Sequence, residues 1–569
     1  MSAVRKLDLI LCWHMHQPDY RDRLSGEFIL PWTYLHAIKD YTDMAWHLEN
    51  HPRARAVVNF VPILLDQLED YAQQFSQKKV LDPLLRLLIH PNLDRIEEAD
   101  RQHVWASCFR GDHNKMIEPF PAYKRLLDIF LFLNAPEENS LSYLSGQYLA
   151  DLLVWYHLVW TGESLRRSHD LLPRLMSKGC GFDFDDRQQL FTLIGEQVCG
   201  VISRYKKLAD EGRIELSTTP YHHPIVPLLL DFHSAQDSLP TIALPHAQSY
   251  PGGRTRAATH IDNAAVSHKK LFGSAPAGMW PAEGGLSTET LKLFAEHGCR
   301  WTASGEGVLV NSLVAANRGS ELSKDKAYLF RPYRVEGAPG ITCFFRHEQL
   351  SDMIGFEYAT WYGSDAVNHF VHQLEAILRQ APEGNDPVVS VILDGENAWE
   401  YYPYNGFYFL SGLYAALQDH PSIRMTTFRD YLGSDAHPSA GSIPKLTAGS
   451  WVYGNFSTWI GDPAKNRAWD LLCAAKGGFD LVMASGRLSK AEQAEARAHL
   501  GNCEGSDWFW WFGDYNPHAS VVSFDQLFRN NLAILYRLLK LPVPLVLNQP
   551  ICIGREGEVE AGGAMRRAS

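Results

Sequence analysis

The sequence predicts an α/β protein built around short, buried strands. Short apolar runs alternate with longer stretches of helical periodicity, as in folds where helices cover a largely parallel sheet. The clearest strand is Val388–Leu393, which is apolar and rich in β-branched residues apart from Ser390. At 569 residues the chain is long enough for one large domain and a smaller one, since single cores rarely exceed about 250–300 residues.

Seven runs are predicted strands. In chain order they are Leu7–Trp13, Ala54–Phe60, Arg213–Thr218, Ala277–Trp280, Arg300–Ala303, Ile341–Phe345 and Val388–Leu393. The amphipathic stretch Ile63–Phe75 follows the second strand. From about residue 120 to 210 helical periodicity dominates, for example in Tyr148–Val159 and Arg187–Leu208, so we expect a helical insertion there.

The character of the sequence changes near residue 440. Residues Ser434–Pro444 are rich in Ser, Gly and Pro and predict a connection. Beyond it, helical periodicity returns in Asn466–Lys476, Lys490–Leu500 and Phe524–Leu539. We therefore expect a domain at 1–435, an α-helical C-terminal domain at 436–550 that contributes to the active-site cleft, and a disordered tail at 551–569.

Composition excludes several classes of partner. The net charge of −12 argues against nucleic acid or an anionic membrane, because both need a basic surface. No apolar run has the length of a membrane helix or the form of a signal peptide. The nine cysteines are scattered without a C-x-x-C pair, which indicates reduced thiols. We expect a cytoplasmic protein, and the sequence leaves its oligomeric state open.

Polar residues follow two of the predicted strands. His14 and His16 are two apart at the end of the first, so their side chains can project to the same face. They suit hydrogen bonding to sugar hydroxyls or metal binding, and a purely structural role is also open. Glu215 lies inside the third strand, where a carboxylate is either site-lining or on an exposed edge. His222 and His223 lie in the loop beyond it.

Two acidic segments carry the strongest chemical signal. Glu283 follows an apolar strand and Trp280 and precedes two glycines, so it is either a nucleophile or a cap for the helix beginning near Ser287. Asp394 ends the best strand, and Glu396 and Glu400 follow among aromatic residues. Asp394 is preferred as the catalytic acid because the first polar residue after a strand points most directly into a site, while Glu396 can hold a ligand or tune the pKa of a neighbour.

Two aromatic segments lie in the C-terminal part. Trp451 and Trp459 have Asn455 and Asp462 close by, which favours contact with substrate. For the second segment, Trp508–Phe512, a domain interface is the favoured role.

Taken in order, these segments resemble glycoside hydrolase family 57, whose members act on α-glucans. Five stretches carry the resemblance: His16–Pro18, Gly212–Glu215 with Thr219–Pro224, Trp280–Ser287, Val391–Glu400 and Gly449–Trp469. They span almost the whole chain and are most similar to α-amylase and amylopullulanase-like members. The resemblance implies an incomplete (β/α)7 barrel with helical insertions, an α-helical C-terminal region, and a retaining mechanism without cofactor or metal.

Carried onto matching positions, the resemblance makes Glu283 the nucleophile and Asp394 the general acid/base. It implies that the sugar site is lined by His14, His16, Gln17, Glu215, His223 and Glu396, with aromatic walls from Trp280, Trp399, Trp451 and Trp459. One position departs from the pattern. Gly305 stands where we expect many relatives to carry an Asp before Glu306, which changes the chemistry of that subsite.

The sequence therefore predicts a retaining hydrolase of α-glucans, acting on α-1,4 and also α-1,6 linkages. A 4-α-glucanotransferase or branching enzyme on the same scaffold is the alternative, and the acceptor decides between them. A different class also fits the histidines. A metal-dependent hydrolase or deacetylase would use His14, His16, His223 and Asp394 as ligands, and chelation would then abolish its activity.

Overall fold

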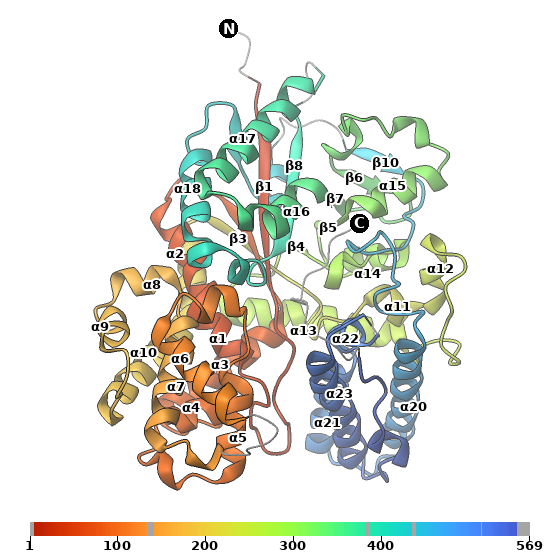
Figure 1. The fold of residues 1–569 in the computed structure, drawn as a ribbon. Helices are drawn as coiled ribbons and strands as arrows, with labels where there is room; N and C mark the ends of the chain where they lie inside the picture. The colour runs from red at the N-terminus through yellow and green to blue at the C-terminus, as the bar shows by residue number, and fades with distance from the viewer. Residues whose placement is uncertain (1–4, 135–140, 383–385, 435–439, 514, 555–569) are drawn as a thin grey trace.

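Seven parallel strands form a barrel at the centre of the computed structural model (Figure 1). The structure describes residues 5–134, 141–382, 386–434, 440–513 and 515–554. The neighbouring order is β7-β5-β4-β3-β2-β1-β8, and β7 pairs with β8 through Arg346 and Ser390, which closes the barrel. The strands are β1 Leu7–Met15, β2 Ala56–Phe60, β3 Ile214–Thr218, β4 Gly278–Met279, β5 Trp301–Gly305, β7 Thr342–Arg346 and β8 Val388–Asp394.

The predicted (β/α)7 fold is thus confirmed, and each of the seven predicted strands overlaps one of these. Three further strands were not predicted from the sequence: β6 Tyr333–Val335, β9 Ile423–Met425 and β10 Gly441–Ile443. They extend the sheet beside β7, β1 and β6 respectively. Each of these strands has three residues, of which the middle one is exposed, so none contains the apolar run that marks a buried strand. β10 lies within the stretch predicted as a connection.

A helical layer separates β2 from β3. It begins earlier than predicted and contains α3 Pro62–Gln77, α4 Pro83–Leu88, α5 Glu98–Cys108, α6 Pro121–Leu133, α7 Gly146–Val159, α8 Glu163–Ser168, α9 Leu171–Lys178 and α10 Phe184–Asp210. Before β2, the chain forms α1 Trp32–His36, a π-helical turn at Ala37–Tyr41 and α2 Thr42–Asn50. The remaining barrel helices are α11 Val226–Leu230, α12 Ala235–Ser238, α13 Gly253–Phe272, α14 Thr288–Glu296, α15 Glu306–Ala315, α16 Glu348–Asp352, α17 Gly363–Gln380, α18 Phe407–Leu417 and α19 Phe428–Leu432.

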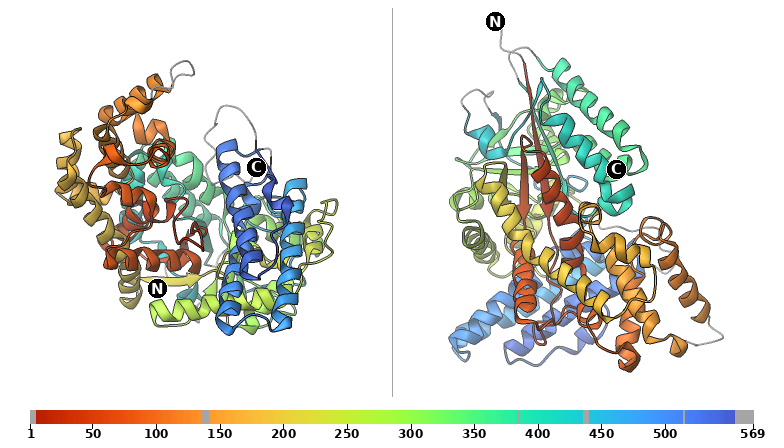
Figure 2. Two further views of the ribbon diagram at one scale, coloured as in Figure 1. Left: turned by 90° about the horizontal axis from the view of Figure 1, so that it is seen from below. Right: turned by 90° about the vertical axis from the view of Figure 1, so that its left-hand side faces the viewer.

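Four helices follow the last strand: α20 Pro463–Ser485, α21 Lys490–Cys503, α22 Asp507–Trp511 and α23 His518–Leu538. Figure 2 shows them on one side of the molecule and the N-terminal helical layer on the other. Both groups extend past the carboxyl ends of the strands, where catalytic groups collect in barrel enzymes (Figure 1).

Glu504 fixes the C-terminal helices to the barrel. Its buried carboxylate accepts hydrogen bonds from Arg256 and His260 of α13, at 2.7 Å each, and from the hydroxyl of Tyr250 at 2.6 Å. These partners hold the pKa of Glu504 well below its usual range, because the Arg256 charge and the donated hydrogen bonds outweigh burial. The residues that follow, Ser506 and Asp507, are thereby placed against the barrel.

Residues 551–554 are more ordered than the sequence suggests. Ile551 and Cys552 are buried, and their backbone N–H groups donate to the carboxylate of Asp525. The predicted disordered tail is therefore wrong for residues 551–554, while residues 555–569 lie outside the described residues, as does the predicted domain boundary at 435–436. Among the described residues, no helix is long and apolar enough to cross a membrane.

Candidate active site

A cavity of about 750 Å³ lies at the carboxyl ends of the strands, between the N-terminal helical layer and the C-terminal helices. It brings together eight of the residues predicted from the sequence: His14, His16, Gln17, His223, Glu283, Asp394, Glu396 and Trp451. Both proposed catalytic carboxyls therefore face one space, although 111 positions separate them in the chain (394 minus 283).

Trp451 holds Glu283. The indole Nε1 donates a 2.9 Å hydrogen bond to Oε2 of the carboxylate, and the backbone N–H of Trp451 donates to the Glu283 carbonyl at 3.1 Å. Two bonds from one residue fix both the backbone and the side chain of Glu283. The carboxylate is thereby oriented at the wall of the cavity before any ligand binds.

The backbone of Glu283 is itself unusual. Its φ of 57° lies in the left-handed region, which is uncommon for a residue other than glycine. Gly284 follows at φ 60°, where a Cβ would lie 3.0 Å from the Trp280 ring and 3.2 Å from Cβ of Trp451. Strained backbone of this kind concentrates at functional sites. The alternative role of Glu283 as a helix cap is wrong, because Ser287 caps α14 by accepting from the N–H of Thr290.

Asp394 ends β8 and lines the same cavity. Burial raises its pKa to about 6, and the opposing influences are a 2.9 Å hydrogen bond from the Asn397 amide and the charges of His16 and Arg346. A carboxyl with this pKa keeps its proton in mildly acidic solution. It can therefore donate a proton to a departing group and take one back afterwards.

Arg346, the last residue of β7, connects the two carboxyls. Its guanidinium donates to the Ile392 carbonyl at 2.7 Å and to Asp352 at 2.6 Å, and it lies 5.5 Å from the centre of the Trp451 ring. It thus supports the indole that binds Glu283 while its charge acts on Asp394. The sequence analysis missed this residue. As the first polar side chain after an apolar strand, Arg346 satisfies the rule that selected Asp394.

Glu396 lies behind Asp394. Its Oε1 accepts from the backbone N–H of His16 at 2.9 Å and from the side chains of Gln17 and Tyr41 at 3.3 Å each. Burial, and then the charge of Asp394, raise the pKa of Glu396 well above its usual range, which favours its protonated form. Oε2 is buried without a hydrogen-bond partner among the described residues.

His14 and His223 form a neutral pair. Nδ1 of His14 lies 2.7 Å from Oδ1 of Asn59, whose amide donates to Ser217, so His14 carries its proton on Nδ1. Its free Nε2 then accepts from Nε2 of His223 at 3.1 Å, and Nδ1 of His223 accepts from the Ser506 hydroxyl at 2.8 Å. Burial lowers the pKa of His14 to about 3 and that of His223 far below its usual value. Neither ring is charged at neutral pH.

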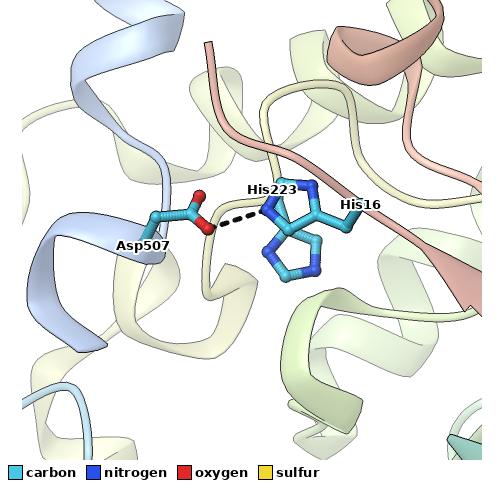
Figure 3. Close-up of side chains that lie close together, drawn as sticks. All are labelled: His16, His223 and Asp507. Carbon is cyan, nitrogen blue, oxygen red and sulfur yellow. Dashed lines mark hydrogen bonds and ion pairs between the residues drawn. The ribbon is translucent and has the colours of Figure 1, made fainter. Parts of the chain in front are cut away.

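His16 stacks on His223 and pairs with Asp507 of α22 at 2.8 Å, as Figure 3 shows. Among the described residues, these three are the group whose ligand atoms lie close enough to hold a metal ion, and Asp394 is not part of it. The two rings lie face to face, with centroids 3.9 Å apart and planes 21° apart. A metal ion must lie in the plane of each ligating ring at about 2.0–2.1 Å from nitrogen, and stacked planes share no such point. The arrangement favours hydrogen bonding over metal binding.

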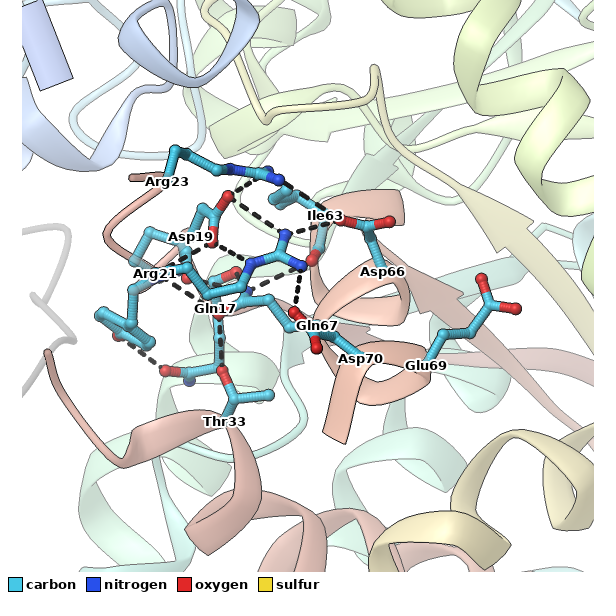
Figure 4. A network of polar contacts seen from close by, with 12 residues as sticks. Gln17, Asp19, Arg21, Arg23, Thr33, Ile63, Asp66, Gln67, Glu69 and Asp70 are labelled. Carbon is cyan, nitrogen blue, oxygen red and sulfur yellow. Dashed lines mark hydrogen bonds and ion pairs between the residues drawn. The ribbon is translucent and has the colours of Figure 1, made fainter. Parts of the chain in front are cut away.

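The segment after His16 is fixed by α3. Arg21 bonds Asp19 at 2.8 Å, Asp66 at 2.6 Å and Asp70 at 2.9 Å, and Gln67 donates to the Pro18 carbonyl at 2.9 Å (Figure 4). Gln17 is buried within this frame, where its Oε1 accepts from the Tyr20 hydroxyl at 2.8 Å. The network makes the first motif a rigid wall of the cavity.

Four predicted site residues lie elsewhere. Glu215 is buried under the cavity, accepting from the Trp301 indole at 2.8 Å and from the Arg429 N–H at 2.9 Å, and it borders a separate, smaller pocket. Three of the four predicted aromatic walls do not line the active-site cavity either: Trp280, Trp399 and Trp459 are fully buried. Trp280 packs behind Trp451, with ring centroids 5.2 Å apart. These tryptophans support the site from behind.

Other aromatic residues take their place. The cavity is lined by Tyr20, Trp32, Phe109, Trp160, Phe356, Tyr401, Trp510, Trp511 and Phe524. Trp510 and Trp511 belong to the segment predicted as an interface, and its other aromatic members, Trp508, Phe509 and Phe512, are buried. Trp32 and Trp160 come from the N-terminal helical region, and no motif in the sequence distinguishes them.

Gly305 has a steric explanation. A Cβ at this position would lie 2.6 Å from Cα of Trp451, so a side chain here would displace the residue that holds Glu283. Glu306 faces away from the cavity and bonds Lys326 at 2.8 Å and Tyr328 at 3.0 Å. Glycine at position 305, in place of the expected Asp, is therefore explained by the close approach of the Trp451 backbone.

A barrel with two carboxyls facing an aromatic cavity at its carboxyl end defines an enzyme of the glycoside hydrolase class. Residues 10–444 match the model of glycosyl hydrolase family 57, and the chain belongs to this family. No curated protein matched the sequence.

Solved structures of the same fold cover nearly the whole chain. A branching enzyme from Thermococcus kodakaraensis, crystallised with glucose, superposes with a TM-score of 0.58 at 15% identity, over 94% of this chain and 90% of its own. A branching enzyme from Pyrococcus horikoshii gives 0.56 at 15%, over 97% and 98%. An α-amylase from Thermotoga maritima gives 0.54 at 12%, over 94% and 93%. At these identities the likeness establishes the fold alone.

Proposed function

We propose that this chain is a retaining α-glucan hydrolase, with Glu283 as nucleophile and Asp394 as general acid/base. The observation that carries the proposal is that two carboxyls from distant segments line one cavity. Burial raises the pKa of Asp394 to about 6, which suits a general acid, and the Trp451 indole orients the carboxylate of Glu283. Two carboxyls on either side of the scissile bond take the acid and nucleophile roles in retaining glycoside hydrolysis.

In the first step, a carboxylate oxygen of Glu283 attacks the anomeric carbon, and the bond between that carbon and the glycosidic oxygen breaks. The proton of Asp394 passes to that oxygen, which leaves as a sugar hydroxyl. In the second step, ionised Asp394 takes a proton from an acceptor hydroxyl. That oxygen displaces Glu283 from the anomeric carbon and restores both carboxyls. Two inversions at the anomeric carbon retain its configuration.

An α-glucan substrate is supported by the cavity and by the relatives. Aromatic side chains offer apolar surfaces to sugar rings, while His16 and Glu396 offer polar groups to hydroxyls. His16, Trp160 and Glu396 line the cavity, and among the described residues one polar atom of each (Nδ1, Nε1 and Oε2 respectively) is buried without a partner. An unpaired buried polar atom is costly, so a small rearrangement that brings a ligand hydroxyl to it would stabilise the complex. The enzymes of similar fold include two branching enzymes and an α-amylase.

Transfer to a second glucan is the other candidate. The similarity to two branching enzymes extends over nearly the full length of each, and the cavity is broad enough to be lined from both helical groups. Hydrolysis and transfer share the first step and differ in the acceptor of the second. The nine free cysteines fit the cytoplasmic location expected from the sequence, where glycogen and maltodextrin are available substrates.

The test is incubation of the purified protein with maltoheptaose, glycogen and pullulan, with and without EDTA, beside Glu283→Gln and Asp394→Asn. We expect shorter or rearranged glucans from the unmodified enzyme, unaffected by EDTA and lost in both variants. Shorter products without longer or branched ones, together with a rise in the number of reducing ends, indicate water as acceptor. Longer or branched products indicate transfer. Activity that disappears with EDTA and survives in Glu283→Gln would overturn the proposal in favour of a metal-dependent enzyme.

A further inference from the structure

Four exposed aromatic side chains lie outside the active-site cavity: Trp361, Tyr362, Tyr404 and Tyr408. Their exposed fractions are 38%, 83%, 59% and 53%. They come from two segments, one leading into α17 and the other leading into and beginning α18. We call this group the aromatic platform.

The two segments of the platform adjoin. The rings of Tyr404 and Tyr408 are 5.5 Å apart and perpendicular. A Cβ at Gly363 would lie 3.3 Å from Cβ of Tyr408, so the backbone just after Tyr362 passes beside the start of α18. Arg167 of α8 joins them from the helical layer. Its guanidinium donates to the Tyr408 hydroxyl at 3.0 Å and lies 5.0 Å and 6.0 Å from the centres of the Tyr408 and Tyr404 rings.

The backbone of the segment that carries Tyr404 is held in an unusual conformation. Tyr404 and Asn405 have φ values of 52° and 53°, both left-handed, and Gly406 follows at 71°. The Asn405 amide donates to the buried Asp43 at 3.0 Å, and a Cβ at Gly406 would lie 2.7 Å from the Trp399 ring. The neighbouring structure thus holds a conformation that is costly for tyrosine, and this conformation leaves the Tyr404 ring in solvent.

Both supporting segments begin in the cavity. Phe356 lines the cavity six positions before Tyr362, and Tyr401 lines it three positions before Tyr404. The Tyr402 hydroxyl donates to the Ile354 carbonyl at 2.5 Å and ties the two segments together. α8 and α18 lie on the side of the molecule away from α20 and α23 (Figure 1). The platform is therefore carried by segments that continue from the wall of the cavity.

We propose that the aromatic platform is a surface site that binds an α-glucan chain outside the catalytic cavity. The proposal rests on the proposed function, since it takes the substrate class from there. Tyrosine and tryptophan rings offer flat apolar surfaces to sugar rings, and their hydroxyls and Arg167 offer donors to sugar oxygens. Four side chains are too few for a stable protein interface, which needs about 800 Å² from each partner.

The test compares glycogen binding by two matched double variants in the Glu283→Gln background, which prevents turnover. One carries Tyr362→Ala and Tyr408→Ala. The other carries Tyr143→Ala, at an exposed tyrosine (82%) outside the platform, and Leu481→Ala, at an exposed leucine (75%). Migration in gels containing graded glycogen gives the dissociation constant. We expect it to rise about tenfold in the platform variant and to stay unchanged in the control, since the platform variant loses two aromatic contacts with the glucan.

The same substitutions are then made in the catalytically intact protein. We expect kcat/KM on glycogen to fall severalfold and kcat/KM on maltotriose, too short to reach both sites, to stay unchanged. Equal glycogen binding by the platform and control variants would overturn the surface site. A protein that binds glycogen through the platform but turns over no glucan would instead overturn the proposed function. The two failures are therefore distinguishable.

Discussion

The indole Nε1 of Trp451 lies 2.9 Å from Oε2 of Glu283, so a residue that follows the last barrel strand in sequence orients the proposed nucleophile. The same indole lies under the guanidinium of Arg346, whose charge acts on Asp394. The Trp451 ring therefore binds Glu283 directly and also contacts Arg346, the residue whose charge acts on Asp394.

Replacing Trp451 with Phe keeps an aromatic ring and removes the N–H donor. A hydrogen bond to a charged group contributes about 1.5–3 kcal/mol, so we expect kcat on maltoheptaose to fall roughly 10- to 150-fold. Trp459→Phe is the matched control, because this buried indole does not line the cavity and its Nε1 has no partner among the described residues. Equal losses in the two variants would show that the Trp451 donor has no specific role.

The pH dependence of kcat/KM reports Asp394. Since its pKa is raised to about 6, the carboxyl is protonated below that pH and loses its proton above it. A general acid acts only when protonated, so we expect activity to fall as the pH rises through about 6. The measurement is kcat/KM on maltoheptaose between pH 4 and 9. A flat profile across this range would exclude Asp394 as the acid.

The same pH profile is measured for the Arg346→Met variant. The Arg346 charge favours the ionised form of Asp394, so its removal raises the pKa further and moves the falling limb to higher pH. Arg331→Met is a control of the same type, because Arg331 also lies over an aromatic ring, that of Tyr333, but does not line the cavity. A limb that stays in place, or moves to lower pH, would contradict the assignment.

Asp507 positions His16 from the C-terminal helices. Asp507→Ala removes the 2.8 Å partner of His16 Nε2, and we expect kcat/KM to fall about tenfold, mainly through KM, because His16 lines the cavity in which we propose that the sugar binds. Asp185→Ala, an exposed acid in the first turn of α10, controls for the loss of a helix-terminal charge. An unchanged KM in Asp507→Ala would place His16 outside the binding surface.

Glu504→Gln tests the attachment of the C-terminal helices. Removing one partner of a buried ion pair leaves Arg256 uncompensated, so we expect a loss of about 3–5 kcal/mol in the free energy of unfolding. The depressed pKa of Glu504 contributes stability that is fully present above the unfolded value of about 4.3 and is lost as the pH falls towards the folded value. The difference from the unmodified protein, measured by urea unfolding, should therefore shrink below about pH 4. A difference independent of pH would point to packing.

The barrel was predictable because its strands are buried on both faces. Leu7–Met15 and Val388–Asp394 are mostly apolar and buried along almost their whole length, whereas Tyr333–Val335 has one exposed residue in three. That Glu283 and Asp394 would line one site was predictable for a related reason, since both follow apolar runs directly. The direction in which a tryptophan side chain points could not be predicted from the sequence. Trp280 and Trp451 both border acidic motifs, yet one supports the site from behind and the other lines it. Contacts across domains, such as His16 with Asp507, depend on tertiary folding and leave no local pattern.

Trapping the covalent intermediate tests the central claim most directly. A 5-fluoro maltosyl fluoride supplies a good leaving group but slows the second step, so the glycosyl-enzyme accumulates and can be mapped by peptide mass spectrometry. We predict one added glycosyl group on the peptide that contains Glu283, and none in Glu283→Gln. A label on any other residue, or turnover of the reagent with inversion and no labelled peptide, would contradict Glu283 as the nucleophile and the retaining mechanism with it.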